Sequence, residues 1–329
     1  MKAAPYLLLA VLLAAVVAAA LLVGHGSLRD PALERTLLEL RATRVGAAFL
    51  AGAALAVGGV VMQGLFRNPL VSPSILGTTA GAMLGGQLSL LALATLAPGA
   101  VSVAGVGLEM VMPAGCLLGA GLALAIVLAF SRERTGSLML ILTGFILTSL
   151  FLGLASFVTS MAQDSWDLGR AVVNFTLGGV AGVSRGQLVV AAPLVGAGIV
   201  AVWLWGGTLD VLLSGEEEAS TLGVDVGEAR RWIIVWVATL TAAAVSVGGN
   251  IAFVGLIVPH VLRTIVGVQH RRLIPAAALL GGTFVVACDV LVRALPTRSE
   301  LPLGVITDLI GAPVFLVLLA RAHKELAHG

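Results

Sequence analysis

The charged side chains that could do chemistry gather in one polar stretch, residues 208–231, of an otherwise apolar chain. The centre of this stretch reads Gly215-Glu216-Glu217-Glu218-Ala219-Ser220-Thr221-Leu222-Gly223. Because ionised side chains are costly in a bilayer, we expect the stretch to lie in water and to meet a soluble partner. We also expect Gly223 to end a short helix with a positive φ, which glycine adopts at little cost.

Signs of catalysis or metal binding are weak. The sequence contains no Walker A, HExxH, GxSxG or CxxC motif, and these are the patterns that common active sites and metal sites leave. His260 has no cysteine, histidine or carboxylate at ligand spacing, and packing is its expected role. The same role is expected of Cys116 and Cys288 in their apolar runs. The histidines in predicted loops or tails receive no role; they are His25, His270, His323 and His328. We therefore predict no catalytic residue, no metal site and no cofactor bound by this chain.

The composition predicts the elements that must position the polar stretch. Hydrophobic residues make up 59% of the 329 residues and charged residues 11%, against about 25% charged in a soluble domain. Apolar runs of about 20 residues favour membrane-spanning helices over a β-barrel. The N-terminal run could be a signal peptide, but we interpret it as the first helix because no clear cleavage site follows it. The ten predicted spans are 5–24, 45–65, 74–97, 110–130, 138–161, 188–206, 231–249, 253–269, 274–294 and 303–321.

An even number of spans places both termini on one side of the membrane. More of the lysines and arginines fall on that side, which includes residues 208–231, so we predict that it is cytoplasmic. The longest break on the outer side, residues 162–187, is expected to contain a short helix ended by glycines.

Several separated motifs resemble one family of transport proteins. The match covers residues from about 40 to 321 and resembles the permeases of type II ABC importers for iron–siderophores, haem and vitamin B12. The resemblance includes Glu218-Ala219 with Leu222-Gly223, which is similar to the loop that docks into the ATP-hydrolysing subunit. The other blocks are Arg41-Ala42-Thr43-Arg44, Gly58-Gly59 through Asn68-Pro69-Leu70, Ile75-Leu76-Gly77, Ala80-Gly81-Ala82, Gly255 through Arg263, Glu300 through Thr307, and Gly311 through Phe315.

This resemblance implies an all-α polytopic fold with about ten transmembrane helices, in one permease domain covering residues 1–329. It implies a homodimer around one pathway, with its fifth and tenth helices near the dimer axis. Two ATP-binding subunits, which use ATP and Mg²⁺, and one substrate-binding protein would complete the complex. We expect a multi-pass protein of a bacterial or archaeal inner (cell) membrane, in contact with lipid, with cytoplasmic termini and no nucleic-acid partner. Transport would proceed by alternating access. Haem, siderophore, cobalamin and oxyanion all remain open as substrates.

The resemblance also implies roles for individual residues. The ATPase-coupling residues would be Glu216, Glu217, Glu218, Ala219, Leu222 and Gly223. The inner gate would be formed by Asn68, Pro69 and Leu70 with Thr135, Gly136 and Ser137, although a simple turn also explains the first three residues. Arg41, Arg44 and Arg293 would dock carboxylates of the binding protein. Two other roles remain open for these arginines: snorkelling to the membrane interface, and an Asp289–Arg293 pair within one helix.

Asp308 is unusual because it lies one to two turns inside the last predicted span. It could favour the positive end of the helix dipole, or it could face a central cavity and there favour a cationic or metal-bearing substrate. The alternative function for the whole chain is a secondary transporter driven by an ion gradient. Such a transporter is expected to place ionisable residues near the middle of the membrane, whereas Asp289 and Asp308 lie near the outer ends of their spans.

Overall fold

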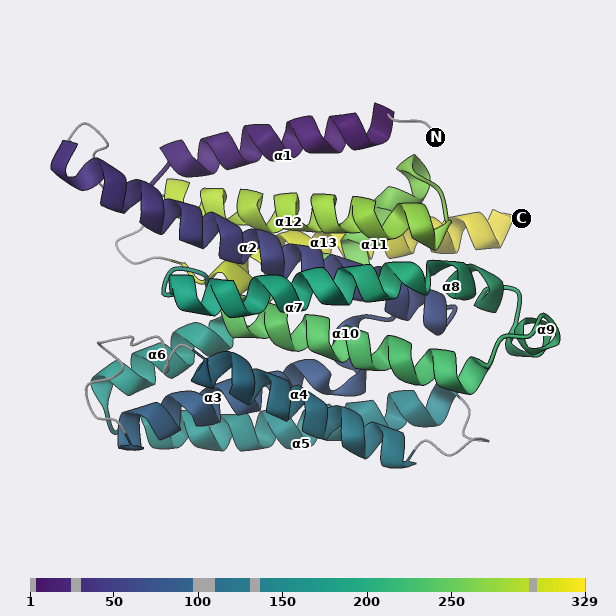
Figure 1. Cartoon of the computed structure of the whole chain (residues 1–329), viewed down its shortest axis with the longest axis horizontal. Coiled ribbons are helices and arrows are strands. Elements are labelled where there is room, and N and C mark those ends of the chain that lie inside the picture. The colour runs from purple at the N-terminus through teal and green to yellow at the C-terminus, as the bar shows by residue number, and fades with distance from the viewer. Residues whose placement is uncertain (1–3, 25–30, 97–109, 131–136, 296–300, 329) are drawn as a thin grey trace.

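The computed structural model describes residues 4–24, 31–96, 110–130, 137–295 and 301–328, and every regular element in this part of the chain is a helix. The helices lie side by side along the longest axis of the molecule (Figure 1). Each of the ten predicted spans corresponds to one of the following helices: α1 (Ala4–Leu22), α2 (Pro31–Leu65), α3 (Thr78–Leu96), α4 (Val111–Phe130), α5 (Ser137–Ala162), α7 (Arg185–Leu204), α10 (Val226–Gly248), α11 (Val254–Ile265), α12 (His270–Ala294) and α13 (Leu303–His328).

Four short elements connect these helices, namely η1 (Pro73–Leu76), α6 (Trp166–Leu177), α8 (Gly206–Leu212) and α9 (Glu216–Thr221). The short helix expected within residues 162–187 is confirmed as α6, which ends at Gly178 with φ 79°. By length and composition, seven of the described helices can cross a membrane, and Val254–Ile265 and Leu303–Leu318 are shorter apolar helices.

The limits of several predicted spans differ from those of the helices, and the differences at α2 and α11 have a clear physical cause. Helix α2 begins at Pro31 rather than at residue 45, because strong helix formers such as Leu, Glu, Arg and Ala continue the helix beyond the apolar run. Its 35 residues reach about 52 Å, well beyond a hydrocarbon core of about 30 Å. Helix α11 has 12 residues instead of the predicted 253–269, and it starts after Phe253, whose φ is 62°. It therefore extends only about 18 Å.

Glycines let the helices at the centre approach closely. A Cβ atom on Gly52 of α2 would lie 2.2 Å from the carbonyl oxygen of Gly281 in α12. One on Gly85 of α3 would lie 2.0 Å from the carbonyl oxygen of Gly115 in α4. Such backbone contact is the usual way for membrane helices to gain packing energy, since lipid is as apolar as their side chains.

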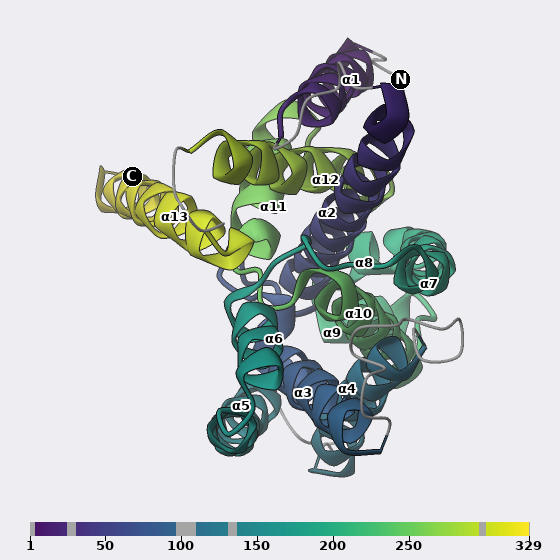
Figure 2. The ribbon, with the colours of Figure 1, turned by 90° about the vertical axis from the view of Figure 1, so that its left-hand side faces the viewer.

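The arrangement separates a buried centre from an apolar margin. Helices α2, α10 and α12 are the most buried of the long apolar helices, whereas α1 and α5 expose most of their length. Figure 2, which looks along the bundle, shows α5 and α13 near its edges with α6 between them.

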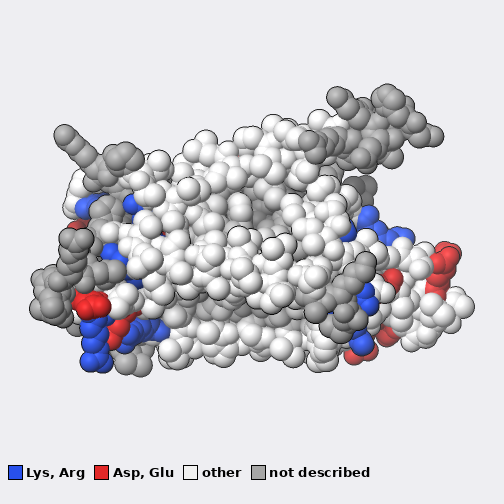
Figure 3. All heavy atoms as spheres, turned by 90° about the horizontal axis from the view of Figure 1, so that it is seen from above, with Lys and Arg blue, Asp and Glu red and all other residues white. Residues whose placement is uncertain are grey.

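Charge lies at the two ends of the bundle, with a broad uncharged band between them (Figure 3). We call the end that carries α8 and α9 the α9 end, and the opposite end, where α6 lies, the α6 end. Helix α1 begins and α13 finishes at the α9 end (Figure 1). The termini therefore share one end with the polar stretch, as an even number of spans requires.

Candidate functional site

The polar stretch forms a compact projection at the α9 end. We call residues 206–223, which comprise α8, α9 and the turn after α9, the coupling segment. The turn is a glycine C-cap: the N–H of Gly223 donates to the carbonyl of Ser220, and that of Val224 donates to Ala219, both at 3.0 Å. Gly223 has φ 84°, so the expected glycine with a positive φ at the end of a short helix is confirmed.

Helix α9 has an anchored face and an exposed face. Ala219 is fully buried, and Glu216 forms an ion pair with Arg230 of α10. On the other face, Glu217 and Glu218 are exposed, and Leu222 exposes 71% of its surface. The exposed leucine and acids of α9 are accessible to a partner, and the ATPase-coupling role of these residues stays a prediction.

The predicted gate residues Asn68, Pro69 and Leu70 form an exposed loop at the same end, after α2. The Asn68 side chain accepts a hydrogen bond from the Leu70 N–H at 2.9 Å and so stabilises the turn. Of the second predicted gate segment, Thr135 and Gly136 lie outside the described residues, and Ser137 is the first residue of α5. The gating role of both segments stays a prediction.

At the α6 end, an acid buried in α12 joins two of the predicted docking arginines. Asp289 is fully buried. Its carboxylate lies 2.8 Å from Arg44 Nε of α2 and 3.0 Å from an Arg293 guanidinium nitrogen one turn along α12. The expected Asp289–Arg293 pair is therefore confirmed, and Arg44 is part of the same cluster.

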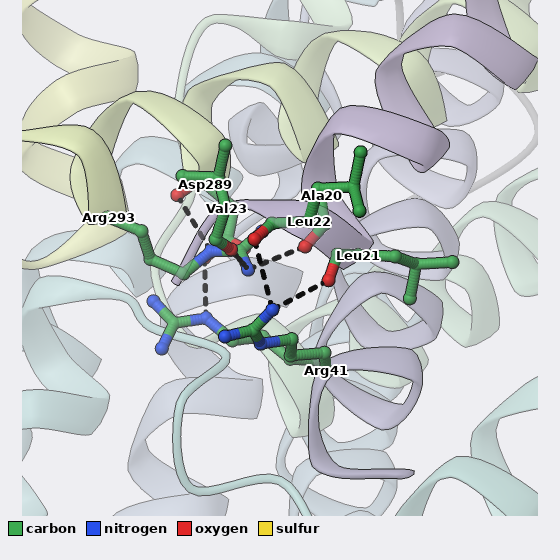
Figure 4. Close-up of polar contacts among 8 residues, drawn as sticks. Ala20, Leu21, Leu22, Val23, Arg41, Asp289 and Arg293 are labelled. Carbon is green, nitrogen blue, oxygen red and sulfur yellow. Dashed lines mark hydrogen bonds and ion pairs between the residues drawn. The ribbon is translucent and has the colours of Figure 1, made fainter. Parts of the chain in front are cut away.

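Two of the three predicted docking arginines, Arg41 and Arg293, cap the C-terminal end of α1 (Figure 4). Arg293 donates to the carbonyls of Ala20 and Val23 at 2.7 and 2.6 Å. Arg41 donates to those of Leu21, Leu22 and Gly24 at 2.8, 3.1 and 3.2 Å. The last carbonyls of a helix have no partner within the helix, and here guanidinium groups from α2 and α12 supply one.

Arg41 and Arg293 are consequently buried, with exposed fractions of 6% and 8%. Arg35 and Arg185 have exposed side chains at this end, and they pair with Glu39 at 3.2 and 3.1 Å, respectively. They line an open hollow of about 460 Å³ together with Glu34, Leu38, Glu39 and Ala42. The docking role of Arg41, Arg44 and Arg293 stays a prediction, and Arg35 and Arg185 are the better exposed candidates.

Asp308 lies in the second turn of α13 and is exposed. None of the ion pairs among the described residues includes it. Within the described ranges, no three His, Cys, Asp or Glu side chains come together in a way that could hold a metal ion. A central cavity would require a second copy of the chain, so the orientation of Asp308 toward such a cavity stays a prediction.

Sequence reasoning missed a polar pair at the α9 end, between a buried histidine and a half-buried acid. His270, which received no role, begins α12 and is 2% exposed, and its Nδ1 lies 2.7 Å from Asp210 Oδ1 of α8. The two residues are 60 positions apart, and no local pattern links them. The only available signal was that Asp210 belongs to the polar stretch.

Comparison with known proteins shows what kind of protein carries these features. The model of the FecCD transport family matches residues 6–321. The chain belongs to the FecCD transport family. It is 40% identical over 280 residues to the cobalamin import system permease protein BtuC of Halobacterium salinarum, covering 85% of this chain and 72% of that protein. It is 34% identical over 299 residues to the molybdate import system permease protein MolB of Haemophilus influenzae, covering 90% and 84%.

A solved structure confirms the fold of this FecCD family member. An inward-facing metal-chelate type ABC transporter is 32% identical, superposes with a TM-score of 0.82, and matches 95% of this chain and 97% of its own. The predicted all-helical fold of a type II ABC-importer permease is therefore confirmed. The chain is the membrane permease of an ABC transporter and not its ATPase.

We expect Asp289→Ala to destabilise the permease strongly. It would leave Arg44 and Arg293 charged in a buried site, and breaking such a pair costs about 3–5 kcal/mol. Glu39→Ala is a matched control, because Glu39 also pairs with two arginines but at the surface, where loss of a pair costs about 0–1 kcal/mol. Thermal unfolding in detergent measures both variants.

Hydrogen exchange adds a local test of the same cluster. Amides near the C-terminal end of α1 should exchange faster in Asp289→Ala than in Glu39→Ala, because Arg293, which caps α1, loses its counter-ion. Equal melting temperatures and equal exchange in the two variants would show that the cluster does not hold α1.

Proposed function

We propose that two copies of this permease form the pathway of an importer that moves a metal chelate or cobalamin into a prokaryotic cell. A separate ATPase would bind at the α9 end, and a substrate-binding protein at the α6 end. The observation that carries the proposal is the exposed face of α9, where Leu222 and two acids project from an apolar bundle at its charged end. In this arrangement both termini are cytoplasmic, because they share the α9 end.

The proposed mechanism is alternating access. Closure of the ATPase dimer would displace the coupling segment, and the loop Asn68–Leu70 at the same end would respond as part of the inner gate. Two features support the idea that a displacement is transmitted: Ala219 is buried and Glu216 is paired with Arg230 of α10. Force on α9 therefore reaches α10 directly, and α10 is one of the most buried helices.

The names of the relatives and one exposed acid support a proposal for the substrate class. Relatives are named for cobalamin and for molybdate, and the similar solved structure is of metal-chelate type. Asp308 lies on an exposed part of α13, where an acid against lipid would be costly. A pair of such acids facing a shared cavity would repel an oxyanion, so we propose a chelate or cobalamin rather than molybdate.

We propose that the outer docking surface is the mixed charged patch around Glu39. Arg35 and Arg185 expose 91% and 66% of their side chains. An arginine fork can hold a carboxylate with two parallel hydrogen bonds. A carboxylate of the binding protein could replace Glu39 as the ion-pair partner of Arg35 and Arg185. Each of the two lobes of the binding protein would bind one permease copy in this way.

The coupling role is tested by two substitutions at one position. Gly223→Val should uncouple ATP hydrolysis from transport, because a β-branched residue at φ 84° is strained by about 1–2 kcal/mol and would unwind the end of α9. Gly223→Asn should behave almost like the wild type, since asparagine tolerates this conformation. A Cβ atom there meets nothing within 4 Å, so steric clash does not confuse the comparison.

The measurement is ATP-driven uptake, ATP hydrolysis and co-purification of the ATPase in reconstituted vesicles. The expected result is loss of uptake with normal membrane insertion for Gly223→Val alone. If both variants transport and stimulate ATP hydrolysis like the wild type, the turn after α9 has no part in coupling.

The docking role is tested by charge reversal. Arg185→Glu should weaken association of the binding protein more at low than at high salt, because exposed charges beyond about 10 Å are screened at 0.1 M ionic strength. Arg271→Glu, at the α9 end, provides a control of equal charge change. Surface plasmon resonance over a salt series measures both, and an Arg185→Glu affinity equal to that of the control at every salt concentration would exclude this surface.

A further inference from the structure

A buried polar junction joins three helices at the α9 end. The Asp210 carboxylate of α8 accepts a hydrogen bond from the His270 backbone N–H at 2.9 Å and one from its Nδ1 at 2.7 Å. Asp210 thus caps the first turn of α12 and orients the imidazole at the same time. His270 is 2% exposed, so the ring is held inside the protein and does not reach the water at this end.

The third helix, α2, is shaped to receive this ring. A Cβ atom on Gly64 would lie 2.2 Å from His270 Nε2 and 2.9 Å from its Cε1. Glycine is therefore required for α2 to pass the imidazole. Among the described residues, Nε2 has no hydrogen-bond partner, so packing against α2 fixes this edge of the ring.

Further contacts tie the start of α8 to the same turn of α12. The indole N–H of Trp203, just before α8, donates to the carbonyl of Arg271 at 3.0 Å. A Cβ atom on Gly206 would lie 3.0 Å from Cγ of Arg271. The α7–α8 corner, the first turn of α12 and the end of α2 therefore form one packed unit.

The loop Asn68–Leu70, which we call the gate loop, begins directly after this packed unit. Three residues after Gly64, Arg67 adopts φ 49°, a conformation that glycine usually supplies at the end of a helix. Its N–H donates to Gly64 at 3.2 Å and the Asn68 N–H donates to Gln63 at 3.1 Å, which closes a Schellman motif. The Arg67 guanidinium lies against Gly215, 3.8 Å from where a Cβ atom would stand, at the start of α9. A strained residue at such a place is a reason to look for function.

We propose that Asp210 and His270 are positioning residues that lock the coupling segment to the end of α2, so that displacement of α9 reaches the gate loop. The inference rests on the proposed function, because it assumes that an ATPase moves α9. Without the junction, α8 would still be covalently joined to α7 and α9, but the direct polar link between α8 and the packed end of α2 would be lost. The ATPase would then hydrolyse ATP without moving the gate.

The test reads gate movement separately from ATP hydrolysis. The reference protein carries Leu70→Cys in the gate loop, and the native Cys116 and Cys288 are both buried. A water-soluble maleimide labels position 70 in the assembled complex, either free of nucleotide or trapped with MgATP and vanadate. Asp210→Ala in this background should keep ATP hydrolysis but reduce the nucleotide-dependent change in labelling rate by about tenfold, a common size for coupling between sites.

Conservative variants separate positioning from folding. Asp210→Asn keeps an oxygen that can accept from the His270 N–H, and it should restore most of the change. Gly64→Ala should lose the change because the ring is displaced, whereas Gly196→Ala should keep it, since a Cβ atom there meets nothing within 4 Å. Ser184→Ala removes the cap of α7 at the other end and controls for loss of a helix cap.

The outcomes are distinct. If the reference protein shows no nucleotide-dependent labelling change, the proposed function fails. If the reference protein responds, and Asp210→Ala and Gly64→Ala respond like it, the junction does not transmit movement and this inference is overturned while the function stands. Equal losses in Asp210→Ala and Ser184→Ala would also overturn it, because general destabilisation would then explain both.

Discussion

Helix ends are the constraint on which the structure depends. Within or near a hydrocarbon layer, water is not there to satisfy the last carbonyls of a helix, and each unsatisfied group is costly. Different groups satisfy the last carbonyls of different helices in this protein. Guanidinium groups of Arg41 and Arg293 satisfy α1, a Schellman motif satisfies α2, and glycine closes α9. The charged residues of an otherwise apolar protein are thus largely concentrated where helices stop.

This constraint also explains why structure and function use the same residues. Arg293, one of the two arginines that cap α1, has Asp289 of the same helix as its counter-ion, and Asp289 also pairs with Arg44 of α2. At the opposite end, the acid that caps α12 belongs to α8. The caps of α1 and α12 thus come from other helices and link elements that are far apart in the sequence, whereas the caps of α2 and α9 are local. The hydrogen bonds that satisfy the ends of α1 and α12 therefore also hold separate helices together.

The sequence predicts the elements well because their signals are local. Apolar run length gives every span, and Gly178 and Gly223 mark the ends of α6 and α9 before the fold is known. The limits of α2 and α11 are wrong for a physical reason: a helix continues past its apolar stretch when its residues favour helix, and it starts late when a residue such as Phe253 turns the chain. Hydropathy measures neither effect.

The site residues divide in the same way. The predicted coupling residues and the predicted gate residues Asn68, Pro69 and Leu70 lie in contiguous motifs, and the structure places both of these groups at the α9 end. The spacing of Asp289 and Arg293 suggested their pair, but the contacts of Arg41 and Arg293 with α1 were not predictable, because backbone carbonyls are present in every residue. His270 was missed because its partner, Asp210, lies 60 positions away. Pairs of this kind are created only by the packing of the helices.

The central claim is that α9 enters an ATPase, and accessibility of Leu222 tests it most directly. A Leu222→Cys protein can be labelled with a water-soluble maleimide in membranes whose cytoplasmic face is open, because both native cysteines are buried. Leu222 is 71% exposed in the isolated chain, so labelling should be fast for the permease alone and strongly slowed when the ATPase is bound. Equal labelling rates with and without a bound ATPase would contradict the account.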